Sequence, residues 1–217
     1  MQNDRTLKFP IKPVIHMLEQ SIINQYDALI FDMDGTLIDT MPSHAKAWEK
    51  VGEHLGYPVK GDVMYELGGA TVRTIAMETC HRYGIPLTLL DEVIRLKRQY
   101  GFEMVMENAT LLPTFDIVKN NLGKRTMALG TGSHSNMVNM LLDKFDLRQY
   151  FNVIVDADMV TTHKPHPETF LKCAEHLGVS PSQCLVFEDA DLGVQAALNG
   201  GMDVFDVRTR LLTKANR

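Results

Sequence analysis

Residues 27–36 read DALIFDMDGT, an apolar run that ends at two aspartates, a glycine and a threonine. Continuous apolar runs are typical of strands that helices cover on both faces of a parallel sheet. Ligands bind at the carboxyl ends of such strands, which is where Asp32 and Asp34 are expected. Two neighbouring carboxylates repel each other, and a shared metal or proton relieves that repulsion. A plain turn is the alternative, because Asp and Gly are common turn residues.

Beyond residue 113, apolar runs alternate with segments of helical periodicity. Strands are expected at 126–129, 153–155, 184–187 and 204–205. Strands that alternate with helices predict an α/β fold, built on a parallel, doubly wound sheet. The residues after Val207 are expected to form a loose tail.

Residues 41–109 show helical periodicity and no convincing strand. Helices are expected to start near Pro42 and Thr71, the second of which offers a capping hydroxyl. About 65 residues are too many for an ordinary connection between two strands. We therefore predict an α/β core formed by residues 1–40 and 110–217, with an inserted all-α cap domain at 41–109. The connections are expected at 40–42 and 108–111.

The first 25 residues are expected to form an extension packed on the core. Apolar side chains recur there at helical spacing, at Ile11, Val14, Ile15, Leu18 and Ile22. Such a stripe is typical of an amphipathic helix that buries one face. A helix that binds a partner is the alternative.

The composition argues against several function classes. The net charge of −5 over 217 residues is unlike the basic surface of a nucleic-acid-binding protein. No apolar run is as long as a membrane span, and residues 1–27 show no signal-peptide core. The three cysteines form no CxxC pair, which suits a reducing compartment. We therefore expect a cytoplasmic protein with neither a nucleic-acid partner nor a membrane partner.

The expected strand at 126–129 leads into Gly130-Thr131-Gly132-Ser133, before a helix. Backbone N–H groups and a hydroxyl in such a turn can hold phosphate oxygens. An ordinary loop with a helix cap is the alternative. A dinucleotide-binding fingerprint is excluded, because Ser135 stands where a third glycine is required.

The expected strand at 184–187 ends in Glu188 and Asp189, much as the first strand ends in acidic residues. An acidic helix N-terminus is the alternative interpretation. Together with Asp32, these oxygens suit Mg²⁺, which prefers hard oxygen ligands. A calcium EF-hand is excluded, because Ser43 stands where its glutamate is required.

Lys164 lies in the segment HKPHP at residues 163–167. The prolines stiffen the backbone, so the loop can aim the ammonium group at a phosphate or a carboxylate. A solvated loop lysine is the alternative.

In order and spacing, these pieces resemble the four motifs of the haloacid dehalogenase-like phosphohydrolases. The motifs are Asp32-Met33-Asp34-Gly35-Thr36, then Thr131, then Lys164, then Glu188-Asp189. The resemblance covers nearly everything from Tyr26 to Val207, and the helical insert looks like the C1-type cap of that family. The chain most resembles the β-phosphoglucomutase-like branch and its fructose-1-phosphate phosphatase-type sugar phosphatases. The resemblance therefore implies a Rossmann-like core with a helical cap.

The resemblance implies a role for each catalytic motif residue. Asp32 would be the nucleophile that forms an aspartyl-phosphate, and Asp34 would be the general acid and base. Thr131 and Lys164 would hold the oxygens of the transferring phosphoryl group. Family members that cleave carbon–halogen bonds lack the second aspartate, so the presence of Asp34 argues against a dehalogenase.

The resemblance also implies one Mg²⁺ ion as the cofactor. Its ligands would be the carboxylates of Asp32 and Asp189 and the backbone carbonyl of Asp34. Glu188 would support the ion.

Further substrate contacts are implied in the core and the cap. Ser133 would contact the substrate from the core, beside Thr131 and Lys164. His44 occupies a cap-entry position that contacts the active site in the mutase branch, with a surface histidine as the alternative. Arg73 is the candidate for gripping the phosphate from the cap. The mutase carries its arginine where this chain has Val72, which favours hydrolysis over the mutase reaction.

The leading hypothesis is a Mg²⁺-dependent phosphatase that hydrolyses small phosphorylated sugars or related metabolites. The alternative is a β-phosphoglucomutase, which returns the phosphoryl group to the sugar. A catalytically silent relative that binds a metabolite or a partner is a third hypothesis. It is disfavoured because no nucleophile or metal ligand is lost. We expect a monomer whose partner is the phosphorylated metabolite.

Overall fold

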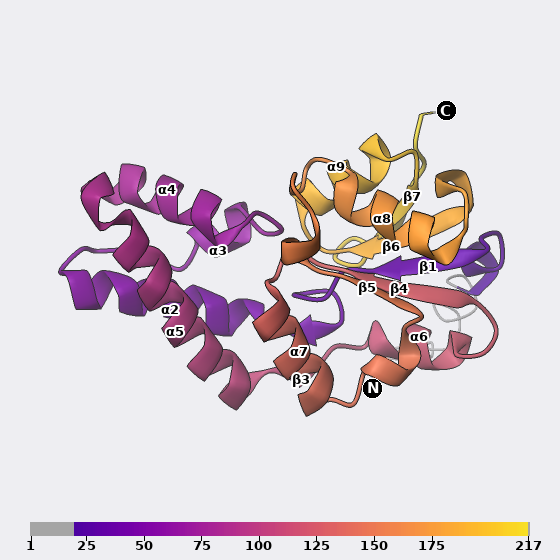
Figure 1. Cartoon of the computed structure of the whole chain (residues 1–217), viewed down its shortest axis with the longest axis horizontal. Helices are drawn as coiled ribbons and strands as arrows, with labels where there is room; N and C mark the ends of the chain where they lie inside the picture. The colour runs from indigo at the N-terminus through magenta and orange to yellow at the C-terminus, as the bar shows by residue number, and fades with distance from the viewer. Residues whose placement is uncertain (1–19, 217) are drawn as a thin grey trace, which may run out of the picture.

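The structure, a computed structural model, describes residues 20–216 and shows a layered core beside a block of helices (Figure 1). The central sheet has six strands in the order β5-β4-β1-β6-β7-β8. Their bounds are β1 (Ala28–Phe31), β4 (Thr126–Gly130), β5 (Val153–Val155), β6 (Cys184–Glu188), β7 (Asp203–Asp206) and β8 (Leu211–Thr213). Every strand predicted from the apolar runs is present in this one sheet.

Strands β5, β4, β1, β6 and β7 run parallel, as predicted. β1 lies in the middle, with Phe31 opposite Leu129 of β4 and Phe187 of β6. Because these strands run in one direction, their carboxyl ends meet at one edge of the sheet. The residues that follow β1, β4 and β6 are therefore brought together.

The prediction of a loose tail after Val207 is wrong. Residues Leu211–Thr213 form β8, which pairs antiparallel with β7. The turn before it is fixed by Arg208, whose guanidinium lies 2.7 Å from Asp191 and 2.8 Å from Asp206. Two leucines are too short an apolar run to indicate an edge strand from the sequence.

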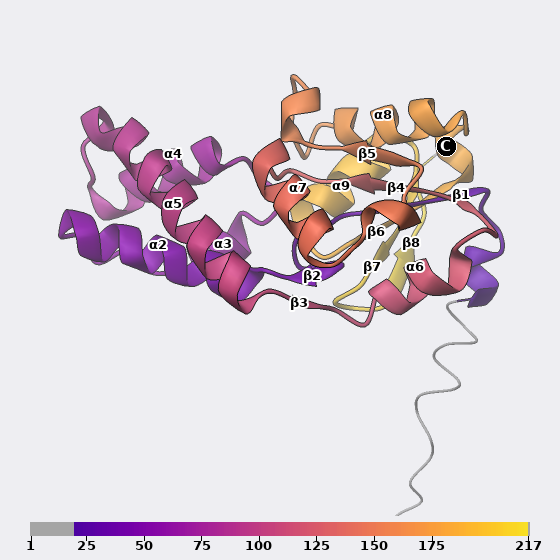
Figure 2. The same ribbon diagram turned by 60° about the horizontal axis from the view of Figure 1, so that its bottom comes forward.

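Helices cover both faces of the sheet (Figures 1 and 2). They are α6 (Phe115–Asn121), α7 (Ser135–Lys144), α8 (Glu168–Leu177) and α9 (Asp191–Asn199), with short 3-10 turns η2 (Arg148–Tyr150), η3 (Ala157–Met159) and η4 (Pro181–Gln183). Leu29 and Phe31 of β1 pack against α6 and α7, whereas Ala28 and Ile30 pack against α8 and α9. Successive side chains of a strand point to opposite faces, so a strand buried on both faces is apolar throughout. The prediction of a doubly wound α/β fold is confirmed.

The remaining helices form a block with an apolar core of its own. They are α2 (Met41–Leu55), α3 (Val63–Glu66), α4 (Val72–Tyr83) and α5 (Leu90–Asn108), with a 3-10 turn η1 (Leu87–Leu89). Trp48 is fully buried in this core. Thr71 caps α4 by accepting a hydrogen bond from the N–H of Thr74, and Gly84 ends α4 in a left-handed conformation.

Two short strands join this block to the core, as Figure 2 shows. β2 (Ile38–Asp39) leads into α2, and β3 (Thr110–Leu111) follows α5. The two strands pair antiparallel, with Ile38 opposite Leu111. Both connections therefore run through one β-ribbon, which the sequence does not predict. The division into a core and a cap at residues 41–109 stays a prediction.

Most of the predicted N-terminal helix lies outside the described residues. Within them, Ile22 is partly buried and Ile23 is buried, and both pack against the apolar cluster beneath α6 and α7. In the described part of the chain, no helix combines the length and apolar character that crossing a bilayer requires.

Candidate active site

A cavity of about 500 Å³ separates the carboxyl edge of the sheet from the helical block. Core residues that follow β1, β4 and β6 line one side, and residues of α2, α4 and α5 line the other. The lining includes Asp32, Asp34, Thr131, Asp189 and His44. Residues far apart in the chain, which the sequence assigns to one site, thus share one cavity.

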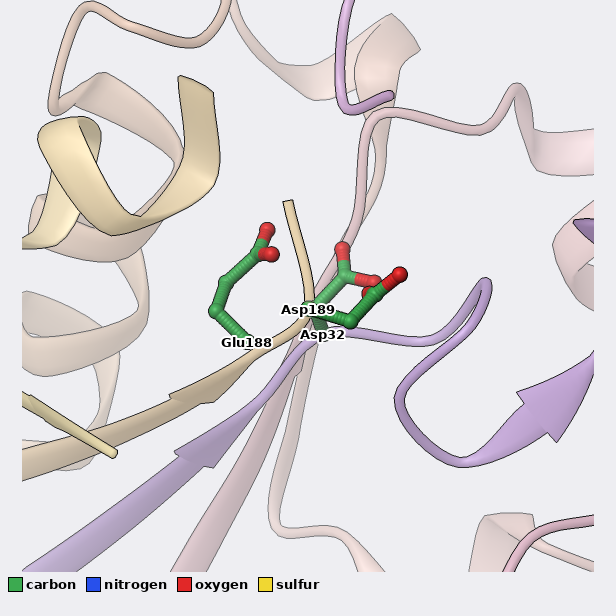
Figure 3. A group of neighbouring side chains, drawn as sticks. All are labelled: Asp32, Glu188 and Asp189. Atoms are coloured by element: carbon green, nitrogen blue, oxygen red, sulfur yellow. The ribbon is translucent and has the colours of Figure 1, made fainter. Parts of the chain in front are cut away.

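Three carboxylates gather at the ends of β1 and β6 (Figure 3). One oxygen from each of Asp32, Glu188 and Asp189 lies within 4.8 Å of the other two. Burial raises the pKa of Asp32, with Lys164 opposing this effect and the neighbouring carboxylates adding to it. Burial, and then the charge of Glu188, raises the pKa of Asp189 to about 7. Buried acidic groups that repel one another form a site that a divalent cation would stabilise.

The turn after β1 leaves room for this cluster. Gly35 has a φ of +83°, and a Cβ at this position would lie 2.1 Å from Oδ2 of Asp189. The hydroxyl of Thr36 donates to Oδ1 of Asp189 at 2.8 Å. Glycine is therefore needed both for the backbone conformation and for the carboxylate beside it. The three clustered side chains all offer carboxylate oxygens, so they fit the predicted Mg²⁺.

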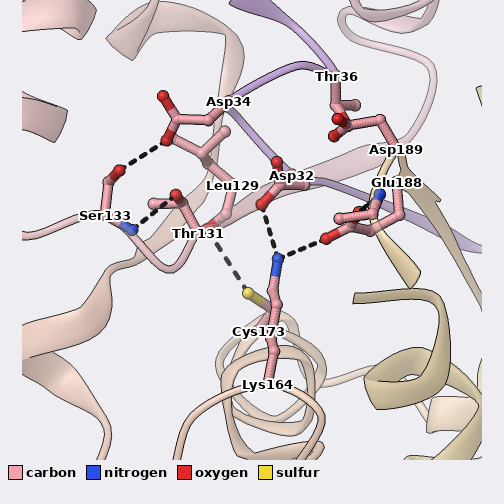
Figure 4. A network of polar contacts seen from close by, with 11 residues as sticks. Asp32, Asp34, Thr36, Leu129, Thr131, Ser133, Lys164, Cys173, Glu188 and Asp189 are labelled. Atoms are coloured by element: carbon pink, nitrogen blue, oxygen red, sulfur yellow. Dashed lines mark hydrogen bonds and ion pairs between the residues drawn. The ribbon is translucent and has the colours of Figure 1, made fainter. Parts of the chain in front are cut away.

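Lys164 bridges two of the three carboxylates (Figure 4). Its Nζ donates to Oδ1 of Asp32 at 2.6 Å and to Oε1 of Glu188 at 2.7 Å, and only 4% of the residue is exposed. Burial acts to lower the pKa of Lys164, but the charges of Asp32 and Glu188 outweigh it and raise the pKa. Lys164 is thus a fixed cation that orients one oxygen of Asp32.

Asp34 is held by three neighbouring side chains. Ser133 donates to its Oδ2 at 2.6 Å (Figure 4). Thr40 donates to its Oδ1 at 2.6 Å, and Nε2 of His44 lies 3.7 Å from Oδ1. Burial acts to raise the pKa of Asp34, but these neighbours outweigh it and lower the pKa to about 2. Ser133, which was predicted to contact substrate, therefore holds the second aspartate in this structure.

Thr131 is buried at the end of β4 and keeps a donor free. Its hydroxyl oxygen accepts from the N–H of Ser133 at 3.0 Å, and its own N–H donates to the carbonyl of Val155 at 3.0 Å. A hydroxyl that accepts one hydrogen bond still has its hydrogen to donate. Thr131 can therefore donate to a phosphate oxygen without losing the contact that shapes its loop.

Lys97 of α5 is a cavity residue that the sequence analysis missed. Only 4% of it is exposed, and its Nζ lies 3.2 Å from Nδ1 of His44. Burial lowers the pKa of Lys97 to about 8, against the opposing charge of Asp34. Burial, and then Lys97, also lowers the pKa of His44. A lysine on the apolar stripe of α5, in helical register between Ile94 and Gly101, is the signal that could have revealed it.

Replacing Lys97 by Met should change how stability depends on pH. The folded chain holds the pKa of Lys97 at about 8, below its ordinary value of 10.5, so the unfolded chain binds more protons between these pH values. The free energy of unfolding of the wild type should therefore rise from pH 8 to 10.5, by up to about 3 kcal/mol. Lys97→Met should lack this rise in urea titrations, whereas exposed Lys50→Met should keep it. Equal pH slopes for wild type and Lys97→Met would contradict the assignment.

The structure brings His44 to the site but not Arg73. His44 is buried between Asp34 and Lys97, so the alternative of a surface histidine is wrong. The side chain of Arg73 is exposed on α4 and lies 3.6 Å from Asp91. Val72, and not Arg73, lines the cavity. Successive helical residues point about 100° apart, so only one of the two can face the cavity. The structure therefore does not place Arg73 where it was predicted to contact the substrate.

Three comparisons with known proteins bear on this site. The family model described as haloacid dehalogenase-like hydrolase matches residues 26–201. The fructose-1-phosphate phosphatase YqaB of Escherichia coli is 45% identical over 188 residues, covering 85% of this chain and 97% of that protein. A phosphorylated carbohydrates phosphatase of Thermotoga maritima is 33% identical, covering 82% of each chain. The crystal structure of β-phosphoglucomutase from Clostridium difficile matches with a TM-score of 0.72 at 25% identity, covering 83% of this chain and 84% of that one.

Proposed function

The chain belongs to the haloacid dehalogenase-like hydrolase family, and from this premise we propose that it is a Mg²⁺-dependent phosphatase of small phosphorylated sugars. The observation that carries the proposal is the convergence of Asp32, Asp34, Lys164 and Asp189 at one end of the cavity. Two relatives that are 45% and 33% identical are named as phosphatases of fructose 1-phosphate and of phosphorylated carbohydrates. A cavity of about 500 Å³ is large enough for a sugar phosphate.

In the first step, a carboxylate oxygen of Asp32 attacks phosphorus and forms an aspartyl-phosphate. The bond between phosphorus and the ester oxygen breaks, and that oxygen takes a proton from Asp34. The low pKa of Asp34 means that it is ionised before substrate arrives. The negative phosphate that binds beside it raises its proton affinity, since like charges disfavour the ionised form. Asp34 therefore takes up a proton from solvent as the substrate binds, and it is this proton that the leaving oxygen receives.

In the second step, water attacks the phosphorus of the aspartyl-phosphate. Asp34 takes a proton from that water, the bond from phosphorus to Asp32 breaks, and inorganic phosphate leaves. Thr131 donates its hydroxyl hydrogen to a phosphoryl oxygen during both steps. Lys164 keeps Asp32 oriented and offsets negative charge at the reacting centre.

Asp32, Asp189 and the backbone carbonyl of Asp34 would hold the Mg²⁺ ion, with Glu188 in support. Bound Mg²⁺ would offset the repulsion between the phosphate and the carboxylates. We assign residues 41–109 as the cap, whose helices α2, α4 and α5 exclude water and contact the sugar.

The β-phosphoglucomutase reaction is the second candidate, since that enzyme of Clostridium difficile has the same fold. It requires a phosphorylated sugar to rebind in the opposite orientation, with its second phosphate held away from Asp32. The expected cap cation, Arg73, is exposed and paired with Asp91. Lys97 and Arg98 of α5 line the cavity, but each already contacts a histidine, His44 and His134 respectively. These observations favour hydrolysis.

A phosphate-release assay over a panel of sugar monophosphates, with β-glucose 1-phosphate among them, tests the proposal. We expect one inorganic phosphate to be released for each sugar monophosphate consumed. This release should stop when a chelator removes the metal and return when Mg²⁺ is added. Isomerisation of β-glucose 1-phosphate in the presence of a bisphosphate primer, with little phosphate release, would favour the mutase. Failure to turn over any phosphate ester, with or without Mg²⁺, would leave the silent relative as the remaining hypothesis.

Asp189→Asn should weaken the apparent Mg²⁺ affinity by at least about tenfold, because an amide is a poorer ligand than a carboxylate. The Mg²⁺ concentration that gives half-maximal phosphate release measures this effect. Asp191→Asn is the matched control, since Asp191 is an exposed carboxylate two residues away that pairs with Arg208. An unchanged Mg²⁺ requirement in Asp189→Asn would remove Asp189 from the ligand set.

A further inference from the structure

Beyond the reacting centre, the core and the helical block meet through a second polar cluster that lines the cavity. Arg98 of α5 contributes its guanidinium, His134 contributes its imidazole at the start of α7, and Asp158 contributes its carboxylate from η3. Helices α5 and α7 approach each other in both views of the molecule (Figures 1 and 2). The side chains of His134 and Asp158 are 31% and 50% exposed, so the cluster stands at the open end of the cavity.

The three side chains form a chain of contacts. Nη2 of Arg98 lies 3.1 Å from Nε2 of His134, and Nδ1 of His134 lies 2.6 Å from Oδ1 of Asp158. The backbone N–H of Ser135 donates to the other oxygen of Asp158 at 2.9 Å. Hydrogen bonds from His134 and then from Ser135 lower the pKa of Asp158 to about 2, so it remains a carboxylate at neutral pH.

The geometry of these two contacts favours one tautomer of the ring. A carboxylate can only accept, so Nδ1 of His134 carries the hydrogen in its contact with Asp158. A guanidinium can only donate, so Nε2 of His134 must offer its lone pair to Arg98. The ring that satisfies both partners is therefore the neutral tautomer. A second proton, on Nε2, would remove the acceptor and place two cations against each other.

We propose that Arg98 and His134 form a pH-dependent latch, which holds the helical block closed over the cavity while His134 is neutral and releases it when His134 is protonated. Arg98, His134 and Asp158 are positioning residues in this scheme. They act through the closure of the cavity and not on the reacting atoms.

The other contacts between the two parts are that of His44, whose Nε2 lies 3.7 Å from Oδ1 of Asp34 at the buried end of the cavity, and contacts at the hinge or through the backbone. Lys144 of α7 donates to the carbonyls of Met106 and Ala109, where α5 ends and the β2–β3 ribbon begins. A Cβ on Gly132 would lie 3.0 Å from the carbonyl oxygen of Gly69, so these two loops touch without side chains. Among the described residues, the latch is therefore the side-chain contact at the exposed end of the cavity, and it must break when that end opens.

Few charged groups of the described chain, other than the latch partners, face the ring of His134. The charged groups that face it are Arg98 from α5, and Asp158 from η3 with Asp156 behind it, 2.7 Å from the hydroxyl of Ser135. Asp34 is reached only through the adjacent Ser133. His134 contacts none of the proposed Mg²⁺ ligands, so the latch is separate from the metal site.

The latch predicts that the open fraction increases as the pH falls from 8 to 5, the range in which histidine ordinarily gains its charge. One partly exposed hydrogen bond with a charged donor shifts such an equilibrium by about threefold to thirtyfold. Product release should become faster as the latch opens, whereas productive closure over substrate should become less favourable.

Fluorescence energy transfer between a label on the cap and a label on the core can measure this opening directly. Glu49→Cys on α2 and Glu175→Cys on α8 provide exposed labelling sites. The native cysteines at 80, 173 and 184 are buried, so the labels should react at the two introduced cysteines. The measurement uses the full chain without substrate or metal. Its outcome therefore does not depend on whether the proposed phosphatase activity is correct.

Two substitutions should abolish the pH response in opposite directions. Arg98→Met removes the donor and should leave the cap mostly open at every pH from 8 to 5. His134→Gln keeps a neutral acceptor near the position of Nε2 but cannot take up a proton, so the cap should stay closed over the same range. Arg95→Met is the matched control, because Arg95 lies one turn earlier on α5 and pairs with Glu92 on the same helix. It should open with falling pH as the wild type does.

Several outcomes would overturn the latch. One is an Arg98→Met protein that stays closed at pH 8. Another is a His134→Gln protein that still opens as the pH falls. A wild type whose distance distribution does not change between pH 8 and 5 would be equally decisive against it.

Discussion

Asp32→Asn is expected to release no phosphate above background, a loss of at least about ten-thousandfold in kcat. The amide has nearly the shape of the carboxylate but lacks the nucleophilic oxygen, so no aspartyl-phosphate can form. The fold should persist, because Lys164 retains its 2.7 Å contact with Glu188. Phosphate release, together with trapping of the phospho-enzyme from wild type but not from the variant, measures the effect.

Asp27→Asn is the matched control for this experiment. Asp27 is exposed just before β1, so the same substitution is made at the opposite end of the strand. It should leave kcat within a factor of about two, as expected for a surface site away from the cavity. Phosphate release by Asp32→Asn at the wild-type rate would show that another group is the nucleophile.

Lys164→Met should lower both activity and stability. Loss of the ammonium removes the cation that orients Asp32, and the expected decrease in kcat is about a thousandfold. The variant also leaves two buried carboxylates, Asp32 and Glu188, without the cation that now lies 2.6 and 2.7 Å from them. Removing one partner of a buried ion pair lowers the free energy of unfolding by about 3–5 kcal/mol, because the other charge stays buried without compensation.

The pH dependence separates this effect from a simple packing defect. Protonation relieves unpaired carboxylates, so the destabilisation in Lys164→Met should be larger at pH 8 than at pH 5. Millimolar Mg²⁺ should recover part of the stability without restoring turnover. Lys172→Met, on the partly exposed face of α8, is the control and should show neither effect. A destabilisation that is independent of pH would argue that Lys164 contributes only packing.

The parallel core was predictable because its signals are local. The run at residues 28–31 is apolar throughout because β1 is buried on both faces, and the residues after it lie at the carboxyl edge by the geometry of parallel strands. The same geometry of parallel strands brings Asp32, Thr131 and Asp189, which follow β1, β4 and β6, to one cavity.

What the sequence does not predict depends on how separate segments meet. Lys97 reads as an ordinary helix lysine until α5 packs against α2 and buries it beside His44. The choice between Val72 and Arg73 depends on the rotation of α4 about its axis, which adjacent residues alone do not fix. Arg98 and His134 lie 36 positions apart, and their contact exists only because the helical block closes on the core.

The β2–β3 ribbon has a consequence for how such enzymes diversify. Entry to and exit from the helical block are paired side by side, with Ile38 opposite Leu111, so both covalent connections lie at one narrow junction. A helical block from a relative could be transplanted at this junction with few contacts to re-engineer. The transplanted block would then set the substrate preference of the chimera, while the core would keep the residues that react with phosphorus.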